Sequence, residues 1–274
     1  MVFCHKKIVP LPPETVFFLT KMLKISIITV TRNSAETLAD AMDSVLRQSY
    51  RHIEYIIVDG NSTDNSVDVI KSYEARFEGR LRWISEKDDG IYNAMNKGVR
   101  MATGDIVGIL NSDDFLSSDT VIEQMVAQFG DNVDAIYGDV HFVHPDNLHK
   151  TVRYYSGSIF RPWLLRFGFL PPHPSLYARR RLFEQYGYYD DSYQISADYE
   201  FIMRLCLNGA NLRYLHLDFV TMRIGGASTR SWKARLIGAK ENLRACRQNG
   251  IRSNYFFIAF KYPIKIFESI FIKN

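Results

Sequence analysis

Cysteine is scarce in this chain, and long apolar runs are missing. Only Cys4, Cys206 and Cys246 occur among 274 residues, and they lie far apart in the sequence. An odd and scattered set of cysteines argues against a disulfide framework and against a zinc site, and it suits a reducing compartment. No charge-free apolar stretch reaches the roughly 18 residues that a membrane-spanning helix needs. Disulfide-stabilised small domains and integral membrane proteins are therefore disfavoured.

Glycine-rich phosphate loops, internal repeats and low-complexity linkers are also missing. No Gly-x-Gly-x-x-Gly follows the first strand-like run at residues 24–30, which disfavours a dinucleotide-dependent oxidoreductase. The N-terminus, "MVFCHKKIVPLPPETVFFLTKM", has prolines and Lys21 within its apolar part and no small-residue cleavage site, so it does not resemble a signal peptide. We expect residues 1–21 to be an extension outside the fold, because Met22 directly precedes the first strand.

The composition is that of a soluble globular protein, with 46% hydrophobic and 23% charged residues. A chain of 274 residues is long enough to bury a sizeable core. The net charge of +4 is unevenly spread, because residues 230–274 hold ten lysines and arginines against two glutamates. The rest of the chain is therefore net acidic. This asymmetry predicts an acidic partner for the C-terminal segment, either a membrane surface or a nucleic acid.

Strand-like and helix-like patterns alternate over the first half of the chain. Apolar and β-branched runs predict strands at residues 24–30, 53–59, 81–85, 105–110 and 134–140. Helical spacing of apolar residues and capping residues predict helices at 35–47, 62–77, 90–102 and 117–129. This alternation indicates an α/β fold with a mostly parallel central sheet and helices on both faces.

The alternation decays after residue 150. Residues 151–180 have the composition of a mixed connecting region, rich in aromatic residues, proline and arginine. A helix beginning near Asp198, two short strands within residues 212–226 and a helix over 231–249 are predicted to follow. In the last stretch, 254–274, a thin charged stripe is surrounded by apolar residues.

Polar residues follow four of the predicted strands at the point where each strand ends. They are Thr31, Arg32 and Asn33, then Asp59, then residues 86–89, then residues 111–114. Ligands bind at the carboxyl ends of parallel strands. The adjacent Asp113 and Asp114 would repel each other unless a group compensates their charge. Mg²⁺ or Mn²⁺ with a substrate diphosphate would be such a group, and a turn or a helix cap is the alternative role.

With these motifs in order, the chain resembles family 2 glycosyltransferases, inverting enzymes of the GT-A fold that use nucleotide sugars. "ISIITVTRN" resembles the opening strand and nucleotide loop, and "IIVDGNSTDNS" resembles the family's VDDGSTD motif. "GIYNAMNKGVRMATGDIVGILNSDD" resembles the segment that ends in the DXD-type metal motif. The resemblance covers residues 24–228 and is strongest to bacterial enzymes that build exopolysaccharide, O-antigen or capsule.

The resemblance implies roles for individual residues. The implied nucleotide-binding positions are Thr31, Arg32, Asn33, Asp59, Asp88, Lys97, Asn111 and Asp113, and the implied metal ligands are Asp113 and Asp114 for Mn²⁺ or Mg²⁺. Asp59 matches the acid that hydrogen-bonds the base, and Asp88 matches a position near the base or ribose. Asn111 stands where many members have Asp, and Gly60 replaces a second acid of the base-binding motif. The resemblance therefore does not fix which nucleobase is bound.

An inverting transfer also needs a carboxylate that takes the proton of the acceptor hydroxyl. In the family this acid opens a late helix, and "SADYEF" places Asp198 there, with Ala197 where Glu is common. Glu200 is the second candidate for the base. A helix N-terminus also favours a carboxylate as a simple cap, so capping is the alternative role of Asp198.

His173 and Arg223 are weaker candidates on the acceptor side. His173 matches a family position near the acceptor, but a structural histidine between prolines is an equal alternative. Arg223, followed by two glycines, could belong to a loop that contacts the diphosphate or to a plain surface turn.

The resemblance gives a division of the chain. Residues 22–229 would be a GT-A catalytic domain, with a nucleotide-binding half at 22–115 and an acceptor half at 116–229. Residues 230–274 would be a basic amphipathic helical tail that lies on an anionic membrane or packs on the domain. We favour the membrane and expect no nucleic-acid partner. The protein is then expected in the cytoplasm, peripheral to the inner face of the bacterial inner membrane.

The expected activity is transfer of a sugar from a nucleotide diphosphate sugar, with UDP as the favoured nucleotide, to a glycan or lipid-linked glycan in cell-surface polysaccharide biosynthesis. A sugar nucleotidyltransferase is one alternative, but "TVTRNSAET" lacks the Gly-rich, Arg-containing loop that would hold a triphosphate. A non-catalytic sugar-nucleotide-binding protein is the other, and it would be expected to lose the metal acids or the base.

Overall fold

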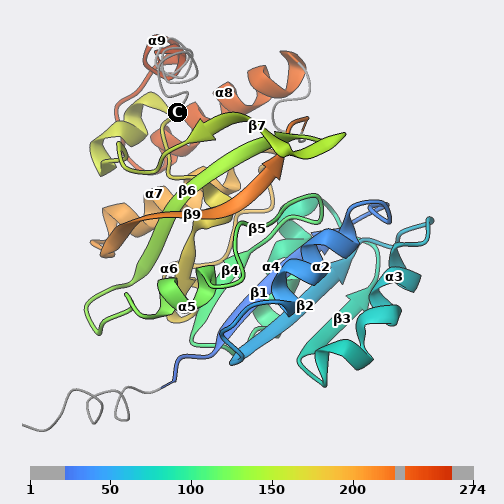
Figure 1. Cartoon of the computed structure of the whole chain (residues 1–274). Helices are drawn as coiled ribbons and strands as arrows, with labels where there is room; N and C mark the ends of the chain where they lie inside the picture. The colour runs from blue at the N-terminus through green and yellow to red at the C-terminus, as the bar shows by residue number, and fades with distance from the viewer. Residues whose placement is uncertain (1–21, 226–231, 261–274) are drawn as a thin grey trace, which may run out of the picture.

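The computed structural model describes residues 22–225 and 232–260 (Figure 1). The expected N-terminal extension at 1–21 and the last part of the expected tail, 261–274, lie outside the described residues. The strands are β1 (Ile25–Thr31), β2 (Ile53–Asp59), β3 (Leu81–Ser85), β4 (Ile106–Ile109), β5 (Phe115–Leu116), β6 (Ala135–His144), β7 (Asn147–Tyr155), β8 (Tyr177–Arg179) and β9 (Leu212–Arg223). The α-helices are α2 (Leu38–Leu46), α3 (Ser66–Tyr73), α4 (Ile91–Met101), α5 (Val121–Val126), α6 (Arg181–Tyr186), α7 (Ala197–Leu207), α8 (Trp232–Gln248) and α9 (Tyr255–Ala259). Short 3-10 helices are η1 (Ala75–Phe77), η2 (Pro162–Phe167) and η3 (His173–Ser175).

One mixed sheet runs through the described part of the chain, in the order β3-β2-β1-β4-β8-β6-β9-β5, with β7 paired to β6. Strands β1 to β4 are mutually parallel, and β6 and β9 are also parallel to each other. The short β8 is antiparallel to both β4 and β6, so it joins the two parallel parts. The expected mostly parallel sheet is confirmed, and the parallel strands place their carboxyl ends along one edge.

Helices cover both faces of the sheet, as the alternation predicts. Alternate strand residues point to opposite faces. Ile28, Val30 and Ile56 belong to one core with residues of α4, α6 and α7. Ile27 and Ile57 belong to the other core with residues of α2, α3 and α5. The strands β1 and β2 are completely buried between the two layers, which explains their unbroken apolar sequences.

Two sequence expectations for the second half are wrong. The region 151–180 is not only a connection, since β7 forms an antiparallel hairpin with β6 and β8 enters the sheet centre. β7 is exposed at most of its first positions, so no apolar run marks it. Residues 212–223 form one strand rather than two, and its register against β6 shifts near Asp139. Such an irregularity bends a strand without ending it.

The described part of the C-terminal segment packs on the domain. Helix α8 buries Leu243, Ala245 and Cys246, and Cys246 lies 3.2 Å from the hydroxyl of Tyr199 in α7. Helix α9 packs near η2 at the upper end of the molecule in Figure 1, where Phe257 contacts Phe167. Among residues 22–225 and 232–260, no helix has the length and apolar character to cross a membrane.

Candidate active site

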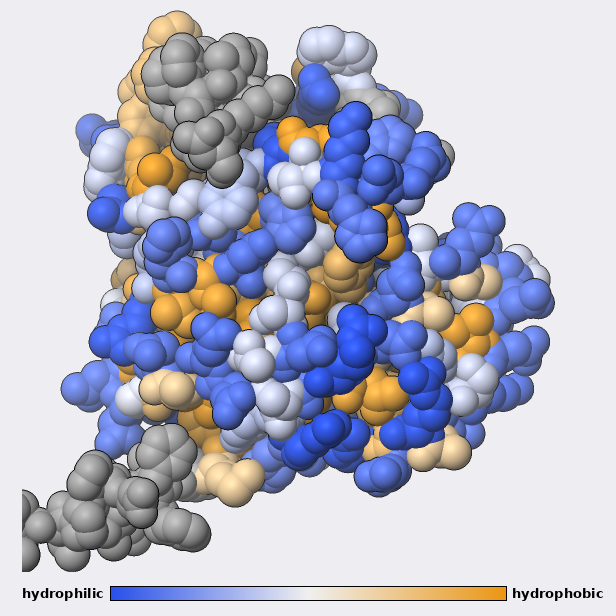
Figure 2. Space-filling view, viewed as in Figure 1, coloured by the Kyte–Doolittle hydropathy of each residue, from blue (hydrophilic) through white to orange (hydrophobic). Residues whose placement is uncertain are grey.

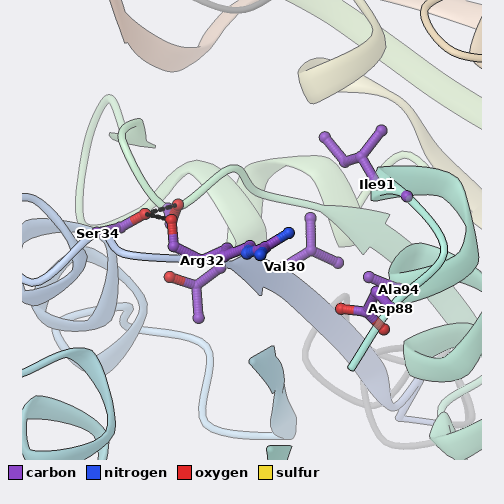
Figure 3. Close-up of a pocket in the computed structure, with 9 residues that line it drawn as sticks. Val30, Arg32, Ser34, Asp88, Ile91 and Ala94 are labelled. Carbon is purple, nitrogen blue, oxygen red and sulfur yellow. Dashed lines mark hydrogen bonds between the residues drawn. The ribbon is translucent and has the colours of Figure 1, made fainter. Parts of the chain in front are cut away.

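A cavity of about 280 Å³ lies at the carboxyl end of β1 and is called the β1 cavity (Figure 3). Its wall includes Val30, Thr31, Arg32, Asp88 and Ile91. Figure 3 shows Arg32 and Asp88 on opposite sides of the space, with Ile91 above it. The hydroxyl Oγ1 of Thr31 is buried and has no hydrogen-bond partner among the described residues. An unpaired buried hydroxyl is costly, and a ligand in the cavity would reach this one only after a local rearrangement.

Asp88 is held in the wall of the β1 cavity by Lys97. The Lys97 ammonium lies 2.7 Å from Asp88 and 2.7 Å from Glu86, and it donates to the carbonyl of Lys87. Lys97 therefore holds the loop of residues 86–88 in place and lies outside the wall of the β1 cavity. A Cβ atom at Gly60 would come within 2.9 Å of the Asp88 carboxylate. The glycine that replaces the family's second acid thus makes room for Asp88.

Asp59 and Asn33 lie under the cavity and join neighbouring loops. The fully buried Asp59 carboxylate accepts hydrogen bonds from the hydroxyl and backbone N–H of Ser62 and from Ser85. Asn33 has a left-handed backbone with φ of 53°, which asparagine tolerates. Its side chain accepts from the N–H of Thr63 at 2.8 Å. Asn33 thus joins the loop after β1 to the loop after β2, and Asp59 joins the loop after β2 to the end of β3. Neither residue lines the β1 cavity.

A second cavity of about 290 Å³, the acid cavity, follows β4. Asn111, Asp113, Asp114 and Asp198 lie in its wall, and it shares Ser112 with the β1 cavity. Asp114 is only 1% exposed, and it accepts hydrogen bonds from the Asn111 amide and the backbone N–H of Arg223. Burial, with a further contribution from the Asp113 charge, raises the pKa of Asp114 to about 7 in spite of the hydrogen bonds from Asn111 and Arg223. The two acids are therefore poorly compensated by the protein.

Arg223 fixes the turn that carries Asp113 and Asp114, which is called the acid turn. Its guanidinium donates to the carbonyl of Asp113 and pairs with Asp40 of α2. The guanidinium also lies over the ring of Phe115. Arg223 is thus not in a plain surface turn, because it joins the end of β9 to the acid turn after β4.

Asp198 lies across the acid cavity, in the first turn of α7. Ser196 occupies the capping position, so the alternative role of Asp198 as the helix cap is wrong. The hydroxyl of Tyr92 lies 3.2 Å from Asp198. His173 lies in the same wall, and its Nε2 is 2.9 Å from the Tyr189 hydroxyl. Burial lowers the pKa of His173, although the Asp198 charge acts in the opposite direction, so the imidazole is neutral at pH 7.

Glu200 is not placed to act as a base. Both of its carboxylate oxygens accept hydrogen bonds from Arg204 at 2.9 Å, and Asn249 lies nearby at 3.3 Å. Its side chain is buried under α8 and is absent from the walls of the β1 and acid cavities. The expectation that Glu200 could replace Asp198 is therefore wrong on geometry.

A third cavity of about 360 Å³ adjoins the acid cavity and is called the arginine cavity. The two share His173, Pro174, Asp198, Met222 and Arg223. Beyond Asp198, the wall carries Arg153 of β7 and Arg235 of α8. The sequence analysis did not identify these two residues. Arg153 lies in a region taken as a connection, and Arg235 has no motif around it.

The acid pair fits a metal held jointly with a ligand. Among the described residues, no three His, Cys, Asp or Glu side chains cluster to hold a metal alone. Mg²⁺ and Mn²⁺ commonly take one or two carboxylates together with substrate phosphate oxygens. Asp113 and Asp114 supply those oxygen ligands beside a cavity large enough for part of a ligand. The residues present therefore suit a divalent metal that arrives with a diphosphate.

Comparison with known protein families identifies the chain. The model of the family described as Glycosyl transferase family 2 matches residues 26–192. The chain belongs to glycosyltransferase family 2. The matched range covers all of the strands and acids of the β1 cavity and the acid turn, so the expected resemblance is confirmed.

A relative named as a glycosyltransferase and two solved structures agree with this family. A PGL/p-HBAD biosynthesis glycosyltransferase of Mycobacterium bovis is 33% identical over 195 residues, which are 70% of this chain and 73% of that protein. The crystal structure of residues 1–349 of Staphylococcus aureus TarS with UDP-GlcNAc superposes with a TM-score of 0.62 at 17% identity, over 80% of this chain and 66% of that chain. A mannosyltransferase of Pyrobaculum calidifontis, solved with GDP-Man and Mn²⁺, superposes with a TM-score of 0.61 at 18% identity, over 84% of this chain and 64% of that chain. The structural matches span slightly less than two thirds of the solved chains and show a shared GT-A fold.

Proposed function

We propose that this glycosyltransferase moves a sugar from a nucleotide diphosphate sugar to a hydroxyl of a glycan or lipid-linked glycan, with inversion at the anomeric carbon. The observation that carries the proposal is the order of three adjoining cavities, with Asp113 and Asp114 in the middle one and Asp198 on its border with the third. A donor and an acceptor can then meet between a phosphate-binding acid pair and a base.

The nucleotide would occupy the β1 cavity. Asp88 offers a carboxylate for a ribose or base, and Arg32 offers a cation. A UDP-sugar is the favoured donor because TarS, which shares the fold, was solved with UDP and with UDP-GlcNAc. Asp59 would hydrogen-bond the base only if its bonds to Ser62 and Ser85 rearrange.

The diphosphate would lie in the acid cavity, beside Asp113 and Asp114. A bound Mn²⁺ or Mg²⁺ would neutralise the diphosphate as it leaves. Asn111 and Arg223 hold the Asp114 carboxylate in place, and Arg223 also holds the carbonyl of Asp113. The solved mannosyltransferase complex with Mn²⁺ supports a divalent metal in this family.

Asp198 would be the catalytic base. Its carboxylate would accept the proton of the acceptor hydroxyl as that oxygen attacks the anomeric carbon opposite the departing nucleotide. Tyr92 orients Asp198 from one side. The neutral His173 can accept or donate a hydrogen bond to the acceptor without adding charge.

We also place the protein in cell-surface polysaccharide biosynthesis, in the cytoplasm at the inner face of the bacterial inner membrane. Exposed aromatic residues support this location. Trp163 is 64% exposed and Phe256 is 77% exposed, and both belong to the η2 and α9 end of the molecule. Figure 2 shows apolar residues at that end, beside atoms of uncertain placement. Basic and aromatic residues together suit an anionic interface.

Calorimetric binding of nucleotides tests the proposal directly. UDP, GDP, CDP and dTDP are titrated with Mn²⁺ and with EDTA into wild type and into the double variant Asp113→Ala/Asp114→Ala. We expect one nucleotide to bind tightly, only with metal and only to wild type. Absence of metal-dependent binding for all four nucleotides would reject the enzymatic proposal in favour of a binding or scaffold role.

A further inference from the structure

The hydroxyl of Tyr92 lies between Asp198 and a backbone carbonyl. Tyr92 is in the first turn of α4, and its hydroxyl is 3.2 Å from Oδ1 of Asp198. The same hydroxyl is within hydrogen-bond distance of the carbonyl of Ile195, which precedes α7. All three residues line the acid cavity. One hydroxyl therefore meets two acceptors at the edge of the space that a substrate would fill.

Helix α4 fixes the place of Tyr92. The Tyr92 side chain is buried, and its ring centre lies 5.9 Å from that of Tyr189. Asn96 accepts from the backbone N–H of Tyr189 at 3.0 Å and donates to its carbonyl at 2.8 Å. Residues four apart on a helix share a face, so Tyr92 and Asn96 hold the segment before α7 at two points one turn apart. This keeps the Tyr92 ring beside Asp198.

The Tyr92 hydroxyl cannot donate fully to both acceptors at once. A tyrosine hydroxyl has one hydrogen to donate and lone pairs that accept. Burial raises the pKa of Tyr92 well above its ordinary value, and the Asp198 charge adds to the rise, so the hydroxyl keeps its hydrogen at neutral pH. A hydrogen that points to Asp198 stabilises the ionised carboxylate. A hydrogen that points to Ile195 leaves the Tyr92 oxygen able to accept from a protonated Asp198.

Charged and titratable side chains from other elements also line the two cavities that Asp198 borders. They are Asp113 and Asp114 of the acid turn, His173 of η3, Arg153 of β7, Arg223 of β9 and Arg235 of α8. Glu241 of α8 accepts from the backbone N–H groups of Ile195 and Ser196, which fixes the backbone before α7. Within the described residues, the side-chain hydrogen bond to the Asp198 carboxylate comes from Tyr92 and not from these groups.

We propose that Tyr92 is a positioning residue for the base, whose hydroxyl donates to the Asp198 carboxylate before transfer and to the Ile195 carbonyl once Asp198 holds the proton. This inference rests on the proposed function, since it takes Asp198 as the base. In the transfer, the acceptor O–H bond breaks and its proton joins Asp198, while the oxygen bonds to the anomeric carbon. The bond from that carbon to the diphosphate breaks, and its electrons leave with the diphosphate oxygen. Asp198 keeps a hydrogen bond in both protonation states.

The position of α4 also connects the base to the donor side. Ile91 and Ala94 of this helix line the β1 cavity, whereas Tyr92 lines the acid cavity. Asp198 in turn borders the arginine cavity, through which an acceptor would reach it. A single rigid helix thus carries residues that face the nucleotide and the residue that holds the base. Such a frame keeps the base at a fixed distance from the donor, as a transfer needs.

An NMR titration of protein with isotope-labelled aspartate carboxyl groups tests the inference without any substrate. The Asp198 resonance is assigned by its loss in Asp198→Asn, and it is followed as pH is lowered in wild type and in Tyr92→Phe. We expect its titration to move to higher pH by about one unit in Tyr92→Phe, because the ionised carboxylate loses a charge-assisted donor. An unchanged titration would overturn the inference.

Tyr199→Phe is the matched control. Tyr199 follows Asp198 on α7, is 1% exposed and donates its hydroxyl to the Leu165 carbonyl, but it lines none of the three cavities. Its replacement removes a buried hydrogen bond from the same helix. It should lower the free energy of unfolding and leave the Asp198 titration unchanged. An equal movement of the titration in both variants would show a general disturbance of α7 and would overturn the positioning role.

Urea unfolding tests the second position of the hydroxyl. Tyr92→Phe should lower the free energy of unfolding both above and below the pH at which Asp198 titrates, because the hydroxyl is bonded in both states. The loss should be larger above that pH, where the acceptor is charged. A loss confined to the higher pH would overturn the donation to the Ile195 carbonyl.

The nucleotide titrations keep this inference separate from the proposed function. Absence of metal-dependent binding of UDP, GDP, CDP and dTDP to wild type would reject the proposed function and, with it, the base role on which this inference rests. Metal-dependent binding to wild type together with an unmoved Asp198 titration in Tyr92→Phe would reject this inference alone.

Discussion

Asp198 and Glu200 lie two residues apart in the first turn of α7, yet their surroundings differ. Residues two apart on a helix do not share a face. Asp198 faces the acid and arginine cavities, whereas Glu200 faces Arg204 and α8. The Glu200 carboxylate, which accepts two hydrogen bonds from Arg204, lies away from both cavities where an acceptor could bind. Local environment therefore separates two acids that the sequence alone leaves as competing bases.

Replacing Asp198 with Asn should abolish sugar transfer and preserve nucleotide binding. The amide keeps the size of the side chain but cannot take a proton, and general-base catalysis typically contributes about 10²- to 10⁴-fold to rate. Turnover is measured as nucleotide release that depends on an acceptor, and nucleotide affinity is measured by calorimetry. Asp131→Asn is the control, because Asp131 is exposed and distant from the cavities. Normal turnover in Asp198→Asn would refute the base assignment.

Secondary-structure elements are joined by buried polar residues as well as by apolar packing. Glu54 of β2 accepts hydrogen bonds from Ser26 of β1, from Lys24 and from Thr103 and Gly104 after α4. Burial by itself raises the pKa of Glu54, but the hydrogen bonds outweigh it and lower the pKa to about 2. This carboxylate therefore holds the amino-terminal ends of β1 and β2 to the turn that precedes β4.

Glu54 should make stability depend on acid pH. Its folded pKa of about 2 lies below the ordinary 4.5. The stabilisation is therefore complete above pH 4.5 and is lost as pH falls toward 2, with a size of about 3 kcal/mol. Glu54→Gln should lower the free energy of unfolding at pH 7 by about 2 to 3 kcal/mol and flatten that pH dependence. Urea unfolding between pH 2.5 and 7 measures both effects, with the exposed Glu36→Gln as control; a Glu54→Gln profile like wild type would contradict the assignment.

Tyr177 of β8 and Tyr55 of β2 form a matched pair in the core. Both are fully buried, but the Tyr55 hydroxyl lies 2.8 Å from Thr29 Oγ1, whereas the Tyr177 hydroxyl has no hydrogen-bond partner within residues 22–225 and 232–260. Tyr177→Phe should leave the free energy of unfolding unchanged or raise it by up to about 1 kcal/mol, because an unpaired buried hydroxyl is removed. Tyr55→Phe should lower it by about 1 kcal/mol. Thermal and urea unfolding of the two variants measure this difference. A greater loss of unfolding free energy in Tyr177→Phe than in Tyr55→Phe would show that the Tyr177 hydroxyl is hydrogen-bonded.

At the scale of the whole molecule, the sheet joins the proposed donor and acceptor sides. The parallel strands β1 to β4 carry the β1 cavity and the acid turn, and β6, β7 and β9 carry the floor of the arginine cavity. The short β8 connects them by pairing with both β4 and β6. Asp113 and Asp114 follow β4, and Asp198 lies in α7, which packs in one core with β4. This packing holds the acid pair and Asp198 at a fixed separation, which a transfer between two substrates needs.

The aromatic end of the molecule should bind anionic membranes. Trp163 of η2 contacts Phe167, which packs against Phe260 after α9, and Trp163 and Phe260 are at least half exposed. We expect co-sedimentation with vesicles that contain anionic lipid, weaker binding to neutral vesicles and loss at high salt. Trp163→Ser/Phe256→Ser and deletion of residues 261–274 should each reduce binding. Leu207→Ser, at an exposed site on α7, is the control, and equal binding by all variants would reject the membrane surface.

The sequence alone determined the elements whose patterns are local. The strand at 24–30 follows from its β-branched residues, and the alternation up to residue 140 follows from helical spacing between such runs. The acids after the strands follow from chain order. The start of α7 close to Asp198 was predicted in the same way. The motif order also identified the family, because those motifs are read residue by residue.

Only the tertiary structure decided which distant residues meet. His173 and Asp198 share a wall, Arg153 of a missed strand and Arg235 of α8 line one cavity, and Glu200 pairs with Arg204. The pairing of β8 and the single bent β9 also depend on partners many residues away. Local periodicity carries no information on strand partners or on the direction of one side chain, because both are set by long-range packing. The sequence therefore singled out the acids after the strands, Asp198 and His173, but it gave no sign of Arg153 and Arg235 in the wall of the arginine cavity, because only the packing of β7 and α8 brings them there.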